Sequence, residues 1–238
     1  MTRTDAINDF FMTALKGESK TYNDHNWYTS GGLKGYIQGR NTNPYPLLKK
    51  ALSEYTIGEV KAFQARSRDA SGQLWATGRY QIIPSTLKGV QANLGLPDSA
   101  KYNEENQDKL AFQLLMNRPT LSKYIKGTIP DTTVNLQKAS LEMAMIWSSI
   151  GVPYPTNGKQ TNQSYYSHDK ASVKSETIQA KLQELRSNLG GKITEATEST
   201  IRFAKKNYWA LIIGVVIIVL AILLIIYRKK IVSYITNL

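Results

Sequence analysis

Residues 75–87 read WATGRYQIIPSTL and contain four consecutive residues, Gly78 to Gln81, that could contribute to a binding or catalytic site just before a predicted helix start. Gln81 carries an amide that both donates and accepts hydrogen bonds, and Tyr80 combines an aromatic face with a polar tip. Arg79 could attract an anionic substrate, and Gly78 permits a close backbone approach or a positive φ. These residue types are typical of a saccharide site, although a hydrogen-bonded core tyrosine and a solvated arginine would explain Tyr80 and Arg79 equally well.

The same stretch resembles the second motif of the lysozyme-like lytic transglycosylases. The GRYQ block, followed by a helix and the turn Leu94-Gly95-Leu96, is similar to the phage lambda-type endolysin family. The pair Gln107-Asp108 and the IWSS stretch of residues 146–149 fall where that family has a Gln-Asp pair and an Ile-Trp helix. The motif LKGES places Glu18 where the family carries its catalytic acid, at the end of the first helix.

This resemblance covers about residues 5–190, with an interruption between Ser19 and Leu74. It implies a peptidoglycan-cleaving enzyme that needs no cofactor and no metal. It also implies Glu18 as the catalytic residue. The substrate-binding residues that it implies are Gly78, Arg79, Tyr80, Gln81 and Trp147.

Cleavage of a glycosidic bond requires a carboxylic acid that stays protonated near neutral pH. Burial beside aromatic side chains raises the pKa of a carboxylic acid, so we expect a raised pKa for Glu18. The expected walls of its pocket are Tyr80 and Trp147, with Trp27 or Tyr22 as further candidates. The alternative is that Glu18 is a solvated residue at a helix end.

A retaining glycosidase has a second carboxylate about 5–5.5 Å from the first, and an inverting enzyme has one farther away. A second phage lysozyme type has an Asp nine residues after the Glu, but Trp27 stands there. Asp24, Asp69 and Glu54 have no motif around them, and whether one of them joins the site stays open. A single-acid mechanism therefore fits better, with a 1,6-anhydro product, and a hydrolytic lysozyme is the alternative.

Composition excludes several other kinds of site. The chain has no Cys and only two His, so a thiolate nucleophile, a Cys-rich zinc site and a multi-His metal site are excluded. The formal charge of +12 indicates a polyanionic partner, such as cell wall, anionic lipid or nucleic acid. No nucleic-acid-binding motif is present, and a nucleic-acid-binding membrane protein stays only as an alternative.

Hydrophobic periodicity and capping residues predict a mainly α domain. The family resemblance implies that this domain is of the α+β lysozyme-like class. Loops or a small hairpin are expected in 19–46, and no core element in the polar stretch 153–167. The expected helices run from 5 to 15 with Thr4 as N-cap, from Thr56 to about Arg66, from Pro84 to Leu94, from Asn103 through Leu115, from Pro119 for a short distance, from Thr133 to about Ser149, and through the repeat Ile178, Leu182, Leu185 and Leu189.

That repeat has heptad-like spacing over fewer than three heptads, and the helix would end at Gly190 and Gly191. It could form a coiled coil or pack on the domain. We expect packing on the domain, because the repeat is short.

Residues 209–227 read WALIIGVVIIVLAILLIIY, without a charge, and as a helix they would rise about 28 Å, the hydrocarbon thickness of a bilayer. Aromatic and basic residues flank this stretch, as at a membrane interface. We expect domains at 1–190 (peptidoglycan-cleaving), 191–207 (stalk), 208–228 (transmembrane helix) and 229–238 (basic tail). A buried core helix would need a surrounding domain that the following residues cannot form.

The N-terminus lacks the layout of a secretory signal peptide, so the expected protein is tail-anchored, with an orientation that the flanking charges do not decide. The expected setting is the internal membrane of a phage virion, where the enzyme would open the wall for the genome, or the host inner membrane before assembly. Expected partners are peptidoglycan glycan strands, the bilayer and other virion membrane or vertex proteins, but no specific nucleic acid. The alternatives are a host-lysis endolysin and a non-catalytic wall-binding or virion structural protein.

Overall fold

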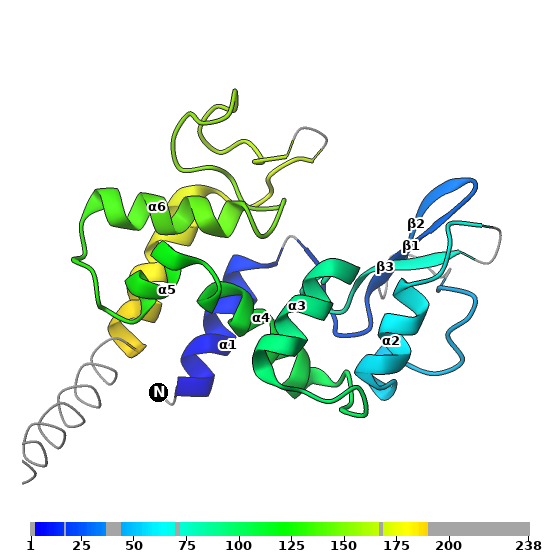
Figure 1. The fold of residues 1–238 in the computed structure, drawn as a ribbon. Coiled ribbons are helices and arrows are strands. Elements are labelled where there is room, and N and C mark those ends of the chain that lie inside the picture. The colour runs from blue at the N-terminus through cyan, green and yellow to red at the C-terminus, as the bar shows by residue number, and fades with distance from the viewer. Residues whose placement is uncertain (1–2, 17, 37–43, 70–71, 167–168, 190–238) are drawn as a thin grey trace, which may run out of the picture. The chain divides into compact units, whose positions relative to one another are not determined.

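The computed structural model describes residues 3–16, 18–36, 44–69, 72–166 and 169–189 of the chain (Figure 1). Residues 1–191 form one compact unit. Its elements are α1 (Arg3–Ala14), β1 (His25–Thr29), β2 (Gly32–Tyr36), the 3-10 helix η1 (Leu52–Glu54), α2 (Ile57–Gln64), β3 (Gln73–Thr77), α3 (Pro84–Leu94), α4 (Glu104–Met116), α5 (Pro119–Ile125), α6 (Thr133–Ala144) and a further helix that includes residues 175–189. The mixture of many helices and one small sheet is consistent with the expected α+β lysozyme-like class.

Three helix starts follow from local sequence, as predicted. Thr56 and Glu59 form a capping box at the start of α2, because each side chain accepts a hydrogen bond from the other residue's backbone N–H. Pro84 occupies the first turn of α3, and Gly95 ends that helix with a φ of 65°. The Asn103 side chain caps α4 by accepting the Asn106 N–H at 3.1 Å.

Two helix boundaries were predicted wrongly. Helix α1 begins at Arg3, so Thr4 lies inside it and is not its N-cap. Helix α6 ends at Ala144 and not near Ser149. The backbone of residues 145–149 forms turns, where the Ser149 carbonyl accepts hydrogen bonds from the N–H groups of Ser172 and Val173, at 2.8 and 2.9 Å. These long-range bonds hold the turn that follows the helix.

The sheet has the strand order β2-β1-β3, and both pairs are antiparallel. It confirms the hairpin expected within 19–46. The register pairs Trp27 with Leu74, and both side chains are buried. Tyr28 and Trp75 are half-buried and contact each other, with ring centroids 5.4 Å apart. One side of the sheet therefore packs on the core, and the other carries aromatic side chains toward solvent.

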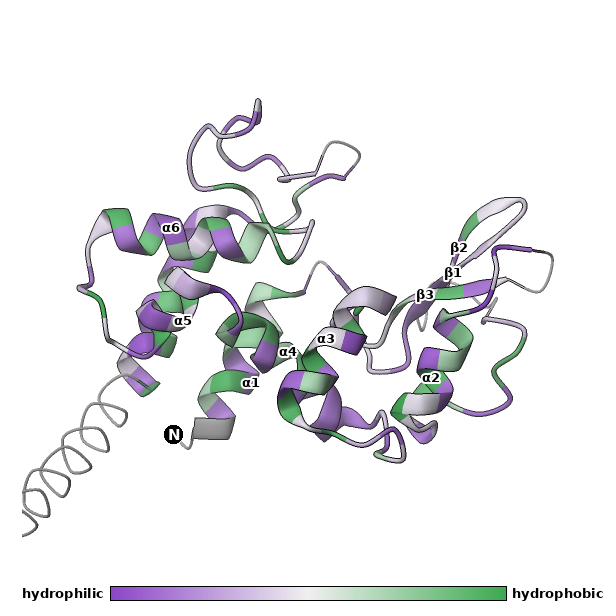
Figure 2. Cartoon of the chain, viewed as in Figure 1, coloured by the Kyte–Doolittle hydropathy of each residue, from purple (hydrophilic) through white to green (hydrophobic). Residues whose placement is uncertain are grey.

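Most helices are amphipathic, as Figure 2 shows by the alternation of hydrophobic and hydrophilic residues along them. The helix of residues 175–189 packs on the domain, as expected, because Ile178, Leu182, Leu185 and Leu189 are all at most 2% exposed. Arg186 adds hydrogen bonds to the carbonyl oxygens of Tyr124 and Ile129, at 2.6 and 2.7 Å. The apolar repeat therefore completes the domain core.

The described part of 153–167 contains no helix or strand, only turns and isolated bridges, which confirms the prediction for that stretch. The predicted stalk (191–207), transmembrane helix (208–228) and basic tail (229–238) lie outside the described residues. None of the helices that the structure describes is long and apolar enough to cross a membrane.

Candidate active site

Glu18 lies just after α1, and its N–H donates a hydrogen bond to the Leu15 carbonyl at 3.0 Å. Its Oε1 accepts the N–H of Ser149 at 3.0 Å, across a sequence separation of 131 residues. Burial raises the pKa of Glu18, and the charge of Asp169 adds to this effect, while the contacts with Ser149 oppose it. Glu18 is thus a partly buried carboxylic acid with a raised pKa, which is the direction expected for a proton donor.

Ser149 belongs to the turn that follows α6. Its carbonyl is held by residues 172–173, so the peptide that contacts Glu18 is fixed from both sides. Ser149 Oγ is buried and has no hydrogen-bond partner among the described residues. The IWSS motif was assigned by resemblance to a helix, whereas the structure shows a turn that brings a backbone donor to Glu18.

Tyr80 is 2% exposed and lies beneath the site. Its hydroxyl donates a hydrogen bond to Asp108 Oδ1 at 2.5 Å, and the Tyr22 hydroxyl donates to the same oxygen at 2.9 Å. Burial, followed by the Asp108 charge, raises the pKa of Tyr22 to about 12. The Tyr80 ring packs 5.0 Å from that of Phe11 in α1. Tyr80 therefore supports the helix that ends next to Glu18.

Trp147 is 3% exposed, and its Nε1–H donates to the Tyr80 carbonyl at 3.0 Å. This bond ties the turn that contacts Glu18 to the GRYQ block. Because both rings are buried here, the predicted sugar contacts of Tyr80 and Trp147 stay a prediction. Both residues were predicted as walls of the Glu18 pocket, and the Trp147–Tyr80 and Ser149–Glu18 hydrogen bonds connect them to Glu18 through one turn.

Gly78 has a φ of 72°, and a Cβ at this position would lie 2.0 Å from Gln107 Oε1. The predicted structural role of this glycine, positive φ and close approach, is confirmed. Gln107 is fully buried, accepts the Arg79 N–H at 3.1 Å and donates to the carbonyls of Tyr22 and Tyr102, at 3.0 and 2.8 Å. Gln107 therefore joins the GRYQ block to the loop that follows Glu18, a role that the sequence did not indicate.

Arg79 and Gln81 are the members of the block that are partly exposed. The Arg79 guanidinium lies 5.4 Å from the centre of the Tyr22 ring. Gln81 has a φ of 48°, and its Nε2 donates to the Gly78 carbonyl at 2.8 Å. Its Oε1 lies 3.5 Å from Asn26 Nδ2. These two side chains can therefore meet a ligand, as predicted from their chemistry.

Asp24 is buried, and its carboxylate accepts hydrogen bonds from Ser19 Oγ, from Thr21 Oγ1 and from the Lys20 N–H, at 2.8, 2.9 and 2.8 Å. It shapes the loop after Glu18, so its oxygens are engaged. Asp24 is therefore not available as a second acid in this structure.

The other two candidates, Asp69 and Glu54, are exposed; Asp69 accepts a hydrogen bond from the Ser67 hydroxyl, and Glu54 lies on η1. Asp169 is the carboxylate whose charge acts on Glu18. No motif surrounds Asp169, and only the folding of the 150–173 loop against Ser149 brings it near. Sequence reasoning missed it for this reason.

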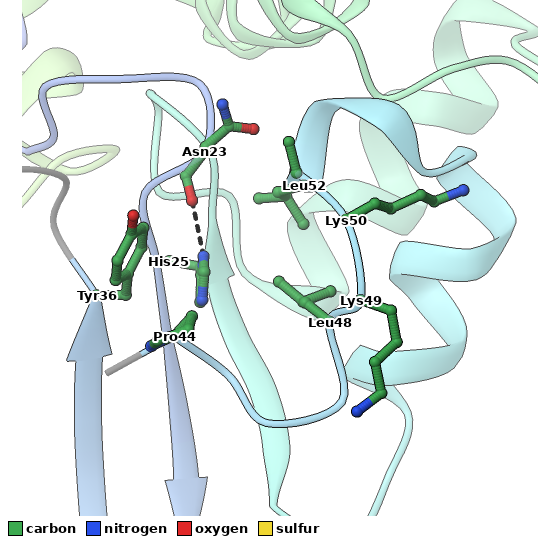
Figure 3. A pocket seen from close by; sticks show the side chains of 9 residues that line it. Asn23, His25, Tyr36, Pro44, Leu48, Lys49, Lys50 and Leu52 are labelled. Atoms are coloured by element: carbon green, nitrogen blue, oxygen red, sulfur yellow. Dashed lines mark hydrogen bonds between the residues drawn. The ribbon is translucent and has the colours of Figure 1, made fainter. Parts of the chain in front are cut away.

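A hollow of about 410 Å³ lies beside β1, between Asn23, His25, Tyr36 and the 44–52 segment (Figure 3). His25 Nε2 accepts the Tyr45 N–H at 3.0 Å, so Nδ1 carries the proton and donates to the Asn23 carbonyl at 2.7 Å. Burial lowers the pKa of His25. The ammonium groups of Lys49 and Lys50 point away from the hollow in Figure 3. His25 is a neutral structural residue, and the hollow offers no catalytic group.

Trp27 packs beside this hollow, against Tyr45, with ring centroids 6.1 Å apart. It belongs to the buried side of the sheet. No group of three or more His, Asp or Glu residues that could hold a metal ion occurs among the described residues.

A family model described as Endolysin matches residues 49–177, which is more than half of the chain. Comparisons with curated proteins and with solved structures found no match. The matched range includes the GRYQ block, Gln107 and Ser149, while Glu18 precedes it. A partly buried carboxylic acid with a raised pKa agrees with this match. Because the match covers more than half of the chain, the chain belongs to the endolysin family, enzymes that degrade peptidoglycan.

Proposed function

We propose that the chain is a lytic transglycosylase, which cleaves the β-1,4 bond between N-acetylmuramic acid and N-acetylglucosamine. The observation that carries this proposal is the Glu18 carboxyl group, partly buried, with a raised pKa and a single backbone donor at 3.0 Å. A raised pKa favours the protonated form of Glu18, which can give its proton to the leaving oxygen. Gln81 and Arg79, which are partly exposed, are the proposed substrate contacts from the GRYQ block, together with Gly78, Tyr80 and Trp147 around them.

In the proposed reaction the Glu18 proton passes to the leaving 4-oxygen of N-acetylglucosamine as the glycosidic bond breaks. The Glu18 carboxylate then accepts the proton of the 6-hydroxyl of the same muramic acid, and that oxygen bonds to C1. The product is a 1,6-anhydro sugar, and Glu18 is protonated again. Such a cycle needs one carboxyl group, which acts first as acid and then as base. This agrees with the hydrogen bonds that the Asp24 carboxylate makes within its own loop, because Asp24 then does not serve as a second acid.

A second candidate is hydrolysis, with Asp169 as the base that activates a water. It is favoured by the effect of the Asp169 charge on the pKa of Glu18. Asp169 is exposed and borders a polar hollow of about 360 Å³, whose lining includes Lys159, Asn162 and Tyr166. An exposed carboxylate is surrounded by bulk water, so it is less suited to hold a single water molecule in position for attack. We therefore place transglycosylation first.

Mass spectrometry of released muropeptides tests the two candidates. Transglycosylation yields products that are lighter than hydrolysis products by the mass of one water. Anhydro products from the wild type and from Asp169→Asn at similar rates would support the single-acid reaction. Reducing-end products, lost in Asp169→Asn, would replace it with hydrolysis.

We further propose that the enzyme is anchored in a membrane by residues 208–228, in the internal membrane of a phage virion or in the host inner membrane before assembly. The support is the uncharged apolar sequence of residues 209–227 with its aromatic and basic flanks. In this setting the enzyme would open the wall for the phage genome, next to other virion membrane or vertex proteins. Carbonate extraction of membranes from cells that express the full chain tests the anchor: release of the protein by carbonate would contradict it.

A further inference from the structure

Arg68 lies on the solvent side of the small sheet, over two aromatic rings. Its guanidinium carbon is 4.0 Å from the centre of the Tyr28 ring and 5.1 Å from that of Trp75. Arg68 Nε donates to Gln73 Oε1 at 3.1 Å. Three residues from β1 and β3 therefore hold an exposed guanidinium group in one orientation.

This cluster continues from the GRYQ block along β1. Asn26 Oδ1 accepts the Ala76 N–H at 2.8 Å, at the irregularity between β1 and β3, and Asn26 Nδ2 approaches Gln81. Tyr28 comes two residues later, about 7 Å farther along an extended strand. The side chains of Asn26 and Tyr28 thus connect Gln81 to Arg68 along β1.

The chemistry of the cluster fits a carboxylate better than a neutral sugar. The guanidinium covers the Tyr28 ring face that a sugar would otherwise stack on. A planar guanidinium presents paired N–H donors that match the two oxygens of a carboxylate. Stacking on Tyr28 and Trp75 limits the conformations of Arg68 before binding, and this lowers the entropic cost of the contact.

The local charge is also positive. Arg66 and Arg68 are exposed in the segment after α2, and Asp69, whose carboxylate accepts the Ser67 hydroxyl, offsets one of the two charges. Peptidoglycan carries its anionic groups on peptide stems beside the glycan. We propose that Arg68, held by Tyr28, Trp75 and Gln73, binds a carboxylate of a peptide stem on the glycan strand that occupies the active site. This inference rests on peptidoglycan as the substrate.

Sedimentation with two wall substrates tests the proposal. The first is purified sacculi free of attached anionic polymers. The second is stem-free glycan from the same sacculi, made by removing the peptide stems with an amidase and converting the lactyl carboxylates that this exposes to amides. The full chain is used with Glu18→Gln, so that the substrate is not consumed. We expect Arg68→Gln to weaken binding to sacculi about tenfold or more, as for loss of a charge-assisted pair, and to leave binding to stem-free glycan unchanged.

Arg66→Gln is the matched control, because it removes the same charge two residues away, and it should weaken binding to sacculi much less than Arg68→Gln does. Arg68→Lys should recover only part of the binding, because it keeps the charge without the planar donor pair. Equal losses on both substrates, equal losses in Arg66→Gln, or no loss on sacculi would each overturn the proposal. The proposed transglycosylation is read separately, from the wild-type products, and its failure would not alter these affinities.

Discussion

Replacement of Glu18 by Gln tests both the chemistry and the physical state of the site. Gln keeps the shape and can still accept the Ser149 N–H, but it cannot transfer a proton. General acid–base catalysis by one group contributes about 10²- to 10⁴-fold. We therefore expect the turnover of purified sacculi to fall by at least about 100-fold, with binding to sacculi unchanged.

The same variant should be more stable than the wild type at neutral pH. The folded state raises the pKa of Glu18, so the folded protein binds more protons than the unfolded chain between the unfolded pKa, about 4.3, and the higher folded value. Wild-type stability is therefore lost as the pH rises through this window. Each unit by which folding raises the pKa of Glu18 lowers the free energy of unfolding by about 1.4 kcal/mol above this pH window. Glu18→Gln removes this loss, so the variant gains stability above the window and none below it.

Urea unfolding of the wild type and of Glu18→Gln at several pH values between 4 and 8 measures this difference. Glu105→Gln is the control, because Glu105 is exposed and its ion pair with Lys109 lowers its pKa. The control should keep full activity and gain no stability at neutral pH. An activity loss below about tenfold, or a stability difference that does not depend on pH, would refute the assignment of Glu18 as a sheltered proton donor.

Three further predictions follow from particular contacts. Asp169→Asn should move the alkaline limb of the kcat/KM profile to lower pH, because the Asp169 charge raises the pKa of Glu18; an unmoved limb would contradict this. Gly78→Ala should destabilise the fold by about 1–3 kcal/mol in urea unfolding, from backbone strain and the clash with Gln107, whereas Gly89→Ala on the open side of α3 should stabilise it by about 0.5–1 kcal/mol. Leu182→Ala should cost about 2–5 kcal/mol, since this side chain is fully buried, and a cost below about 1 kcal/mol would mean that its helix contributes little to the core.

Helix starts and ends that depend on a few neighbouring residues were predictable. The capping box at Thr56, Pro84 and Gly95 around α3, and the Asn103 cap each satisfy backbone groups within one turn. The apolar repeat that begins at Ile178 also predicted its buried side, since periodicity identifies one face of a helix.

The end of α6 was not predictable in the same way. The sequence through Ser149 continues a helical pattern, but α6 ends at Ala144, and the turn that follows it is hydrogen-bonded at Ser149 to residues 172–173. Propensity carries no information about such distant partners. For the same reason the sequence left two alternatives for Tyr80, a buried core tyrosine and a sugar contact, because whether an aromatic ring faces solvent depends on what packs over it.

The sequence by itself determined the local elements, the glycine at position 78, the absence of thiol chemistry and the residue types of a saccharide-cleaving site. Only the tertiary structure decided that the Ser149 N–H meets Glu18, that Gln107 joins two loops and that Asp24 is engaged in its own turn. The physical reason is that the pKa of an acid depends on burial and on neighbouring charges. Those are properties of chain segments that only folding brings together.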